Sequence, residues 1–174
     1  GGEAGPPRNS RREQHRGEEI VVVSTEAGRV KVAERYGNVL HADLAIVHKR
    51  RVKGAKNQVE AKEVVGEVEG RTCVLIDDMI DTAGTIVSAV NLLIDRGARE
   101  VWVAATHGVL SGPAVDRLKN APVRQVVVTN TLPIPDDKRF DSLHVLSIAP
   151  IIAEALDAVF EDTSVSEIFR GDNV

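Results

Sequence analysis

Residues 73–86 read C-V-L-I-D-D-M-I-D-T-A-G-T-I, and this stretch decides the fold. The apolar run 73–76 is typical of a strand buried on both faces, the kind found in parallel sheets. Two adjacent acids follow it, then a turn of small residues, then the periodic apolar positions of a helix. Because ligands of α/β proteins bind at the carboxyl ends of parallel strands, the stretch predicts a site as well as a fold.

Five further apolar runs alternate with longer amphipathic stretches along the chain. They lie at residues 20–23, 44–47, 101–105, 126–128 and 145–148. This alternation predicts βαβ units and therefore an α/β fold with a mainly parallel sheet flanked by helices. The apolar spacing predicts helices at 85–96, 113–119 and 151–160, and a further helix at 27–40 whose propensity Gly37 lowers.

Length and composition fit one globular domain. The chain has 174 residues, 43% of them hydrophobic, and Cys73 is its only cysteine, which excludes a disulfide scaffold and favours a reducing, cytoplasmic setting. A net charge of −4 gives no sign of general nucleic-acid binding. No apolar run approaches the roughly 18 residues of a membrane span.

Two segments are polar and lack a periodic apolar face. Residues 1–19 are rich in Gly, Pro, Arg and Glu, so we expect a disordered lead-in before a single domain at 20–174. Residues 49–62 are basic and nearly without apolar side chains, and we expect an exposed, mobile loop there. The run 63–68 then reads as a short edge hairpin.

The acids and the turn after the 73–76 run suit a sugar phosphate. Asp77 and Asp78 alternate along the strand end, so at least one can accept hydrogen bonds from vicinal sugar hydroxyls. The turn that follows offers backbone N–H groups at a helix N-terminus, which favours a phosphate. The residues of this turn are Asp81, Thr82, Ala83, Gly84 and Thr85. The alternative is that the acids merely cap the helix.

This stretch resembles the phosphoribosyl-binding loop shared by type I phosphoribosyltransferases and ribose-phosphate diphosphokinases, also called phosphoribosyl pyrophosphate synthases. The form with Met79 and Ile80 between the acids is similar to the diphosphokinase branch. The likeness extends in order from about residue 20 to the end, as for the C-terminal half of those enzymes. It includes V-V-V-S-T-E-A-G (21–28), A-D-L-A-I-V-H-K-R-R (42–51), T-H-G-V-L-S-G-P-A (106–114), V-T-N-T-L-P (128–133) and S-V-S-E-I-F (164–169).

The resemblance implies a type I phosphoribosyltransferase-like fold and transfer of diphosphate from ATP to ribose 5-phosphate, with Mg²⁺ as cofactor. It places the catalytic basic pair on Lys49 and Arg51, the ribose 5-phosphate site on the acids and turn just described, and an acid near the metal at Glu26. It implies an inhibitory phosphate site that uses Ser164, Ser166 and Phe169. The family expectation is also a homo-oligomer, a hexamer or another assembly built from dimers.

The sequence departs from the family in two respects. The family usually shows Ser-Pro-Asp-Ala-Gly-Gly in its pyrophosphate loop, where this chain has Glu26 in place of the aspartate and Arg29 in place of the second glycine. Most of the family's ATP-binding loops are not found here. Two rivals therefore stay open: a non-catalytic phosphoribosyl-binding or regulatory subunit, and a true phosphoribosyltransferase, against which the 164–169 motif argues.

Overall fold

The computed structural model describes residues 19–26, 29–51, 60–161, 164–165 and 168, and gives only the backbone of residues 49–51, 60 and 61. The expected lead-in therefore lies almost wholly outside the described residues. Within them, seven strands form one sheet in the order β3-β2-β1-β4-β5-β6-β7. The strands are β1 (Ile20–Ser24), β2 (Asp43–Arg51), β3 (Glu60–Val65), β4 (Thr72–Ile80), β5 (Glu100–Gly108), β6 (Val123–Thr129) and β7 (Leu143–Leu146). All neighbours pair in parallel except β2 and β3.

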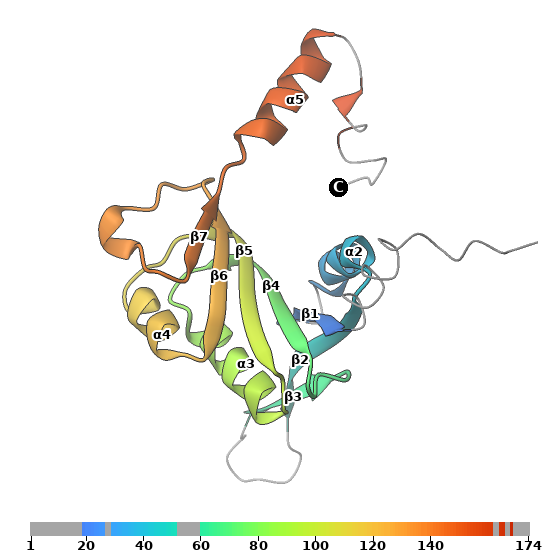
Figure 1. Ribbon diagram of the computed structural model, residues 1–174, viewed down its shortest axis with the longest axis vertical. Coiled ribbons are helices and arrows are strands. Elements are labelled where there is room, and N and C mark those ends of the chain that lie inside the picture. The colour runs from blue at the N-terminus through green and yellow to red at the C-terminus, as the bar shows by residue number, and fades with distance from the viewer. Residues whose placement is uncertain (1–18, 27–28, 52–59, 162–163, 166–167, 169–174) are drawn as a thin grey trace, which may run out of the picture.

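Helices cover both faces of the sheet (Figure 1). The helices of the described residues are α2 (Val30–Leu40), α3 (Gly84–Asp95), α4 (Ala114–Asn120) and α5 (Ala149–Phe160), with a short 3₁₀ helix at Asp136–Lys138. Helices α3 and α4 lie on one face and α2 on the other. The parallel α/β architecture predicted from the alternating runs is confirmed.

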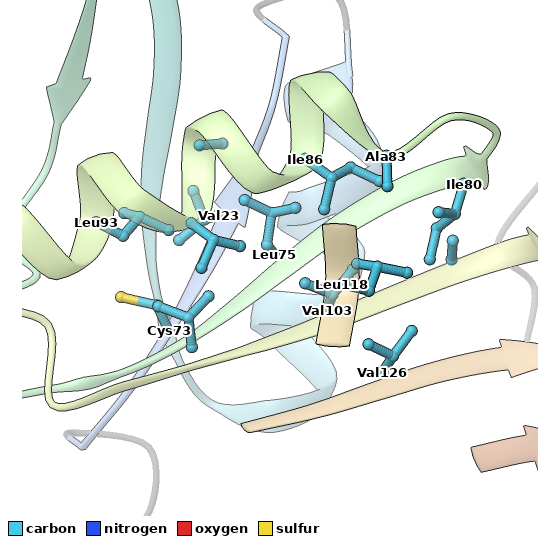
Figure 2. Packing of buried hydrophobic residues seen from close by; sticks show 14 of the residues in the cluster. Val23, Cys73, Leu75, Ile80, Ala83, Ile86, Leu93, Val103, Leu118 and Val126 are labelled. Carbon is cyan, nitrogen blue, oxygen red and sulfur yellow. The ribbon is translucent and has the colours of Figure 1, made fainter. Parts of the chain in front are cut away.

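The main core lies between the sheet and the α3 and α4 face. Alternate strand residues such as Val23, Leu75 and Val103 are fully buried and pack toward Leu93 of α3 and Leu118 of α4 (Figure 2). This period-two burial is what a strand covered by a helix requires. A smaller cluster under α2 contains residues 22, 33 and 76.

Gly37 explains how α2 can lie close to β2. A Cβ atom at this position would be 3.1 Å from the carbonyl oxygen of Ala42 and 3.2 Å from the Leu44 side chain. Such distances are too short for a comfortable contact. The glycine that weakens the helical propensity is therefore the residue that lets the helix pack.

The polar segment 49–62 differs from the prediction at both ends. Strand β2 continues through Arg51, β3 begins at Glu60, and the two pair antiparallel, so residues 49–51 and 60–62 are strand rather than loop. The hairpin at the sheet edge is formed by β2 and β3, not within residues 63–68. An edge strand has only one neighbour, so the apolar pattern that marks buried strands is weak there. Residues 52–59 lie outside the described part.

Helix α5 leaves the sheet after β7 and projects away from it (Figure 1). Its large apolar residues are exposed, since Leu156 retains 52% of its accessible surface and Phe160 85%, while Ala158 is buried. The apolar periodicity at 151–160 therefore predicted the helix correctly, but the apolar stripe of α5 does not pack on this sheet.

Cys73 lies fully buried in β4, and this burial raises the pKa of its thiol to about 11. The thiol is thus an inert part of the core, as its apolar neighbours suggest. None of the helices among the described residues combines the length and the apolar character needed to cross a membrane.

Candidate ribose-phosphate site

The site begins where β4 extends beyond its neighbour β1. Strand β1 ends at Ser24, which pairs with Ile76, whereas β5 follows β4 as far as the pair Ile80 and Gly108. Asp77 and Asp78 therefore lie inside the last part of β4 and not in a loop after it. Their strand is hydrogen-bonded to β5 on one side, and the chain leaving β1 crosses its other side.

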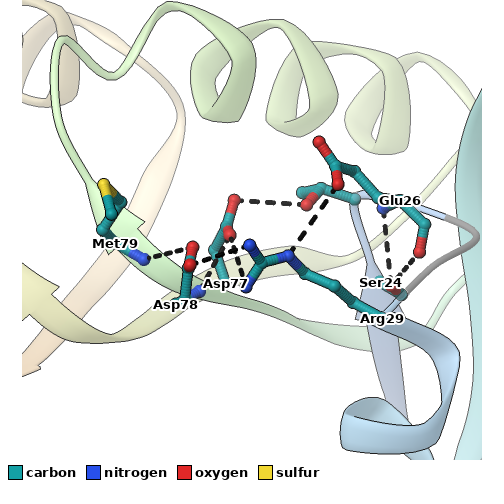
Figure 3. Close-up of polar contacts among 7 residues, drawn as sticks. Ser24, Glu26, Arg29, Asp77, Asp78 and Met79 are labelled. Atoms are coloured by element: carbon teal, nitrogen blue, oxygen red, sulfur yellow. Dashed lines mark hydrogen bonds and ion pairs between the residues drawn. The ribbon is translucent and has the colours of Figure 1, made fainter.

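The two acids are held by a set of short contacts (Figure 3). Asp77 accepts hydrogen bonds from the Asp78 backbone N–H at 2.8 Å and from the Thr25 hydroxyl at 3.2 Å. Asp78 accepts the Met79 N–H at 2.8 Å and pairs with the Arg29 guanidinium at 2.7 Å. An ionised carboxylate has about four acceptor positions. Each acid can therefore be fixed by these donors and still accept sugar hydroxyls.

Next to the acids, the N-terminus of α3 is open. Ala83 precedes the helix in the left-handed conformation, with φ of 60°, and among the described residues no side chain caps the helix. The first helical bond runs from the Val87 N–H to the Ala83 carbonyl at 2.9 Å. The backbone N–H groups ahead of Val87 have no intrahelical acceptor and carry the positive end of the helix dipole. The capping-only interpretation of the acids is therefore not supported.

Contacts from the β5–α4 connection brace this turn. Arg117 of α4 donates to the Thr82 carbonyl at 2.9 Å. The Ser111 hydroxyl donates to the Asp81 carboxylate, and the Ser111 N–H donates to the Asp81 carbonyl at 3.1 Å. The carboxylate of Asp81 is thus partly committed to the turn itself.

One open cavity of about 310 Å³ brings these elements together. It is lined by Glu26, Arg29, Asp77, Asp78, Met79, Asp81, Thr82, Ala83, Gly84, Thr85 and Ile86. Every residue that the sequence assigned to ribose 5-phosphate binding therefore lies at one cavity, with Glu26 beside them. A second cavity of about 440 Å³ shares Glu26 and Thr85 and extends toward His48 of β2 and Lys62 of β3.

The comparisons with known proteins agree with this geometry. Residues 54–170 match the family model described as the phosphoribosyl synthetase-associated domain. The chain belongs to the phosphoribosyl synthetase-associated family. The fold agrees as well, since the crystal structure of phosphoribosylpyrophosphate synthetase from Mycobacterium smegmatis has a TM-score of 0.76 and 52% identity, and covers 88% of this chain and 49% of that chain.

Curated relatives of this chain share one name. A "Ribose-phosphate pyrophosphokinase" of Streptomyces avermitilis is 59% identical over 150 residues, which cover 86% of this chain and 46% of the relative. One from Mycobacterium tuberculosis strain H37Rv is 56% identical over 154 residues, covering 88% of this chain and 47% of the relative. The chain thus spans about half the length of the curated relatives it matches.

The pKa values of the two acids in this site are shifted in opposite directions. Burial, together with the neighbouring Asp78, raises the pKa of Asp77 above its ordinary value. Burial would also raise the pKa of Asp78, but the hydrogen bond and charge of Arg29 outweigh it, so the pKa of Asp78 is lowered. Asp78 is therefore the more firmly ionised acid.

Other candidate residues are placed less completely by the structure. Lys49 and Arg51 lie in β2, opposite Lys62 and Glu60 of β3, and their side chains are outside the description. Their catalytic role stays a prediction. So does the inhibitory site, since Ser166 and Phe169 are not among the described residues and Ser164 lies beyond α5.

The polar residues at the carboxyl ends of β5 and β6 have partners near these strand ends. His107 Nδ1 lies 2.8 Å from the Thr131 hydroxyl, Thr129 donates to the Thr106 carbonyl at 2.7 Å, and Asn130 accepts the Ile148 N–H at 2.9 Å. These residues do not line the 310 Å³ cavity. Contacts of this kind are typical of polar residues that stabilise a turn.

The residues present do not fit a protein-held magnesium ion. Among the described residues there is no group of three or more His, Cys, Asp or Glu side chains that could hold a metal. Glu26, the acid expected near the metal, instead lies 3.8 Å from Arg29 Nε. Sequence reasoning identified Arg29 as a departure but missed its pairing with Asp78, because that contact depends on β1 and β4 being neighbours in the sheet.

Proposed function

We propose that this chain supplies the acceptor side of a ribose-phosphate pyrophosphokinase, which transfers diphosphate from ATP to ribose 5-phosphate and so forms phosphoribosyl pyrophosphate and AMP. The observation that carries the proposal is the cavity in which two fixed carboxylates stand beside a helix N-terminus that no described side chain caps. The names of relatives at 56% to 59% identity support the reaction class.

The ligand's two ends match the two parts of the cavity. Asp77 and Asp78 accept hydrogen bonds from the ribose hydroxyls, for which their remaining acceptor positions suffice. The 5-phosphate binds the backbone N–H groups at the start of α3, where the helix dipole favours a dianion. The left-handed Ala83 and the side-chain-free Gly84 leave that backbone accessible.

In the reaction the anomeric hydroxyl oxygen attacks the β-phosphorus of ATP. The bond from this phosphorus to the oxygen that bridges it to the α-phosphorus breaks, AMP leaves with that oxygen, and the hydroxyl proton is released. The transition state spreads negative charge over the phosphoryl oxygens, which cationic side chains stabilise. We assign this role to Lys49 and Arg51.

Calorimetry with ribose 5-phosphate tests the acceptor site. The double variant Asp77→Ala/Asp78→Ala should lose binding, because hydrogen bonds to a charged group contribute about 1.5–3 kcal/mol each. The adjacent acids of the 3₁₀ helix, Asp136 and Asp137, provide a matched control, and their double alanine variant should bind as the parent does. Equal affinity in the parent and the Asp77/Asp78 variant would refute the assignment.

The donor side is a separate proposal. Positioning two reactants contributes about 7–11 kcal/mol of barrier lowering, and the resemblance assigns most of the ATP-binding loops to the half of the family's enzymes that this sequence does not match. We therefore expect the 174-residue chain to bind ribose 5-phosphate but not to release AMP at ordinary rates of about 1–1000 per second. Cytoplasmic location stays a prediction from the cysteine content, and assembly into a homo-oligomer stays a prediction from the resemblance.

A further inference from the structure

One guanidinium lies among three carboxylates at the edge of the cavity (Figure 3). Arg29 Nη2 is 2.7 Å from Asp78 Oδ2, Nη1 is 3.9 Å from Asp77 Oδ1, and Nε is 3.8 Å from Glu26 Oε2. The three acids come from two different strand ends. A single side chain therefore bridges the β1–α2 connection and β4.

Local backbone contacts fix the position of Arg29. Its N–H donates to the Glu26 carbonyl at 3.1 Å, and the Ser24 hydroxyl donates to the same carbonyl at 2.7 Å. The first of these contacts holds the Arg29 backbone against Glu26, at the residue that precedes α2. The hydrogen bond to Asp78 raises the pKa of Arg29 further, so its charge is permanent.

A metal ion and this guanidinium exclude one another. Mg²⁺ requires oxygen ligands at about 2.0–2.1 Å in octahedral geometry, whereas these acids are arranged around a planar group at hydrogen-bond distances. A divalent cation among the three acids would also lie next to the Arg29 charge, and like charges at about 4 Å repel. Binding the metal there would require Arg29 to leave.

We propose that Arg29 is the resident cation of this acid cluster and takes the place of a protein-bound divalent metal. It offsets part of the negative charge of Glu26, Asp77 and Asp78 and orients Asp78 for the sugar, so ribose 5-phosphate binds without a metal ion. The part that concerns the sugar rests on the function proposed above. Arg29 is thus a positioning residue that acts through Asp78.

The metal part is tested without any sugar. Mn²⁺ serves as a paramagnetic probe, titrated by electron spin resonance into the parent chain and into Arg29→Ala, Arg29→Gln and Arg29→Lys. We expect the two neutral variants to bind Mn²⁺ about tenfold more tightly than the parent, because a positive charge about 4 Å away has been removed. Adding Asp78→Ala to either neutral variant should abolish the gain, and the lysine variant should behave as the parent.

A distant arginine provides the control. Arg124 also pairs with a carboxylate, Glu100, at 3.8 Å, but it lies at the start of β6, at the other end of the sheet. Arg124→Ala should leave Mn²⁺ binding unchanged. Two neutral substitutions of Arg29 are used so that a folding defect in one, detected by circular dichroism, leaves the other as the test.

The sugar part is tested by calorimetry in EDTA. The parent should bind ribose 5-phosphate equally well with EDTA and with Mg²⁺, while the neutral variants should bind about tenfold more weakly in EDTA and recover when Mg²⁺ is added. The inference would be overturned if the parent chain bound Mn²⁺ as tightly as the Arg29→Ala variant does. If the Mn²⁺ results are as expected but neither the parent nor any variant binds ribose 5-phosphate, the proposed function is wrong. The assignment of Arg29 as the resident cation would then still hold.

Discussion

Ile80 joins the stability of the core to the shape of the site, so we expect truncations there to act on both. Its side chain is fully buried in the main cluster, and its carbonyl accepts the N–H groups of Val109 at 3.0 Å and Leu110 at 2.9 Å. In the sequence it lies between the two acids of β4 and the turn formed by residues 81–85. A cavity at this residue would therefore loosen the connection between them.

The magnitude follows from the atoms removed. Ile80→Val deletes one carbon and should lower the free energy of unfolding by about 0.5–1.5 kcal/mol, whereas Ile80→Ala deletes three and should lower it by about 2–5 kcal/mol. For a chain of this size the alanine variant should melt about 4–20 °C lower. Leu156→Ala removes the same kind of surface from exposed α5 and should change stability by less than about 0.5 kcal/mol.

Urea unfolding followed by tryptophan fluorescence measures these differences. Trp102 is the single tryptophan, and it lies on β5, paired with β4. A decrease in the free energy of unfolding below about 1 kcal/mol for Ile80→Ala would refute this packing of Ile80, because it would mean that the neighbouring side chains fill the cavity. A loss for Leu156→Ala equal to that for Ile80→Ala would show that the α5 stripe is covered in solution.

Three other outcomes are expected. In carboxyl NMR titrations Asp78 should titrate at lower pH than Asp77. The fold depresses the pKa of Asp78, so its contribution to stability should be complete above the ordinary aspartate pKa and be lost as the pH falls through the depressed value. If Asp77 titrated at lower pH than Asp78, the charge arrangement would be contradicted. Lys49→Ala or Arg51→Ala in a full-length enzyme should lower turnover by about a hundredfold or more with the melting temperature and ribose 5-phosphate affinity unchanged, and a large stability loss with normal turnover would make both residues structural. Cys73 should resist thiol reagents at pH 8 in the folded chain and react only on unfolding; rapid labelling without unfolding would show that β4 is accessible.

Much of the fold followed from local pattern. Buried parallel strands are continuously apolar and the helices between them have a clear period, so each of the six apolar runs overlaps a strand of the sheet. The hairpin at the β3 edge of the sheet was not predicted. Residues 49–51 and 60–62 are polar because a hairpin at an edge has less surface to bury, and this makes a strand look like a loop.

The grouping of the candidate site residues was predictable where they are contiguous in the sequence and not where it depends on topology. Asp77, Asp78 and the turn after them are contiguous, so their residue types and order already indicated a sugar phosphate. The partner of Asp78 is 49 residues away in the sequence, and only the adjacency of β1 and β4 brings Arg29 to it. In the same way, the apolar stripe of α5 predicted a helix but carried no information about what it packs against.

The unequal lengths of β1 and β4 affect the local dynamics of the site. Beyond Ile76, β4 is paired with a strand on one side only, and side-chain carboxylates accept the N–H groups of Asp78 and Met79. Amide protons held in this way exchange with solvent through small local openings rather than through global unfolding. The segment that carries the two acids can therefore adjust on a fast timescale while the core strands beside it stay closed, and a bound ligand would slow its amide exchange before it changed the melting temperature.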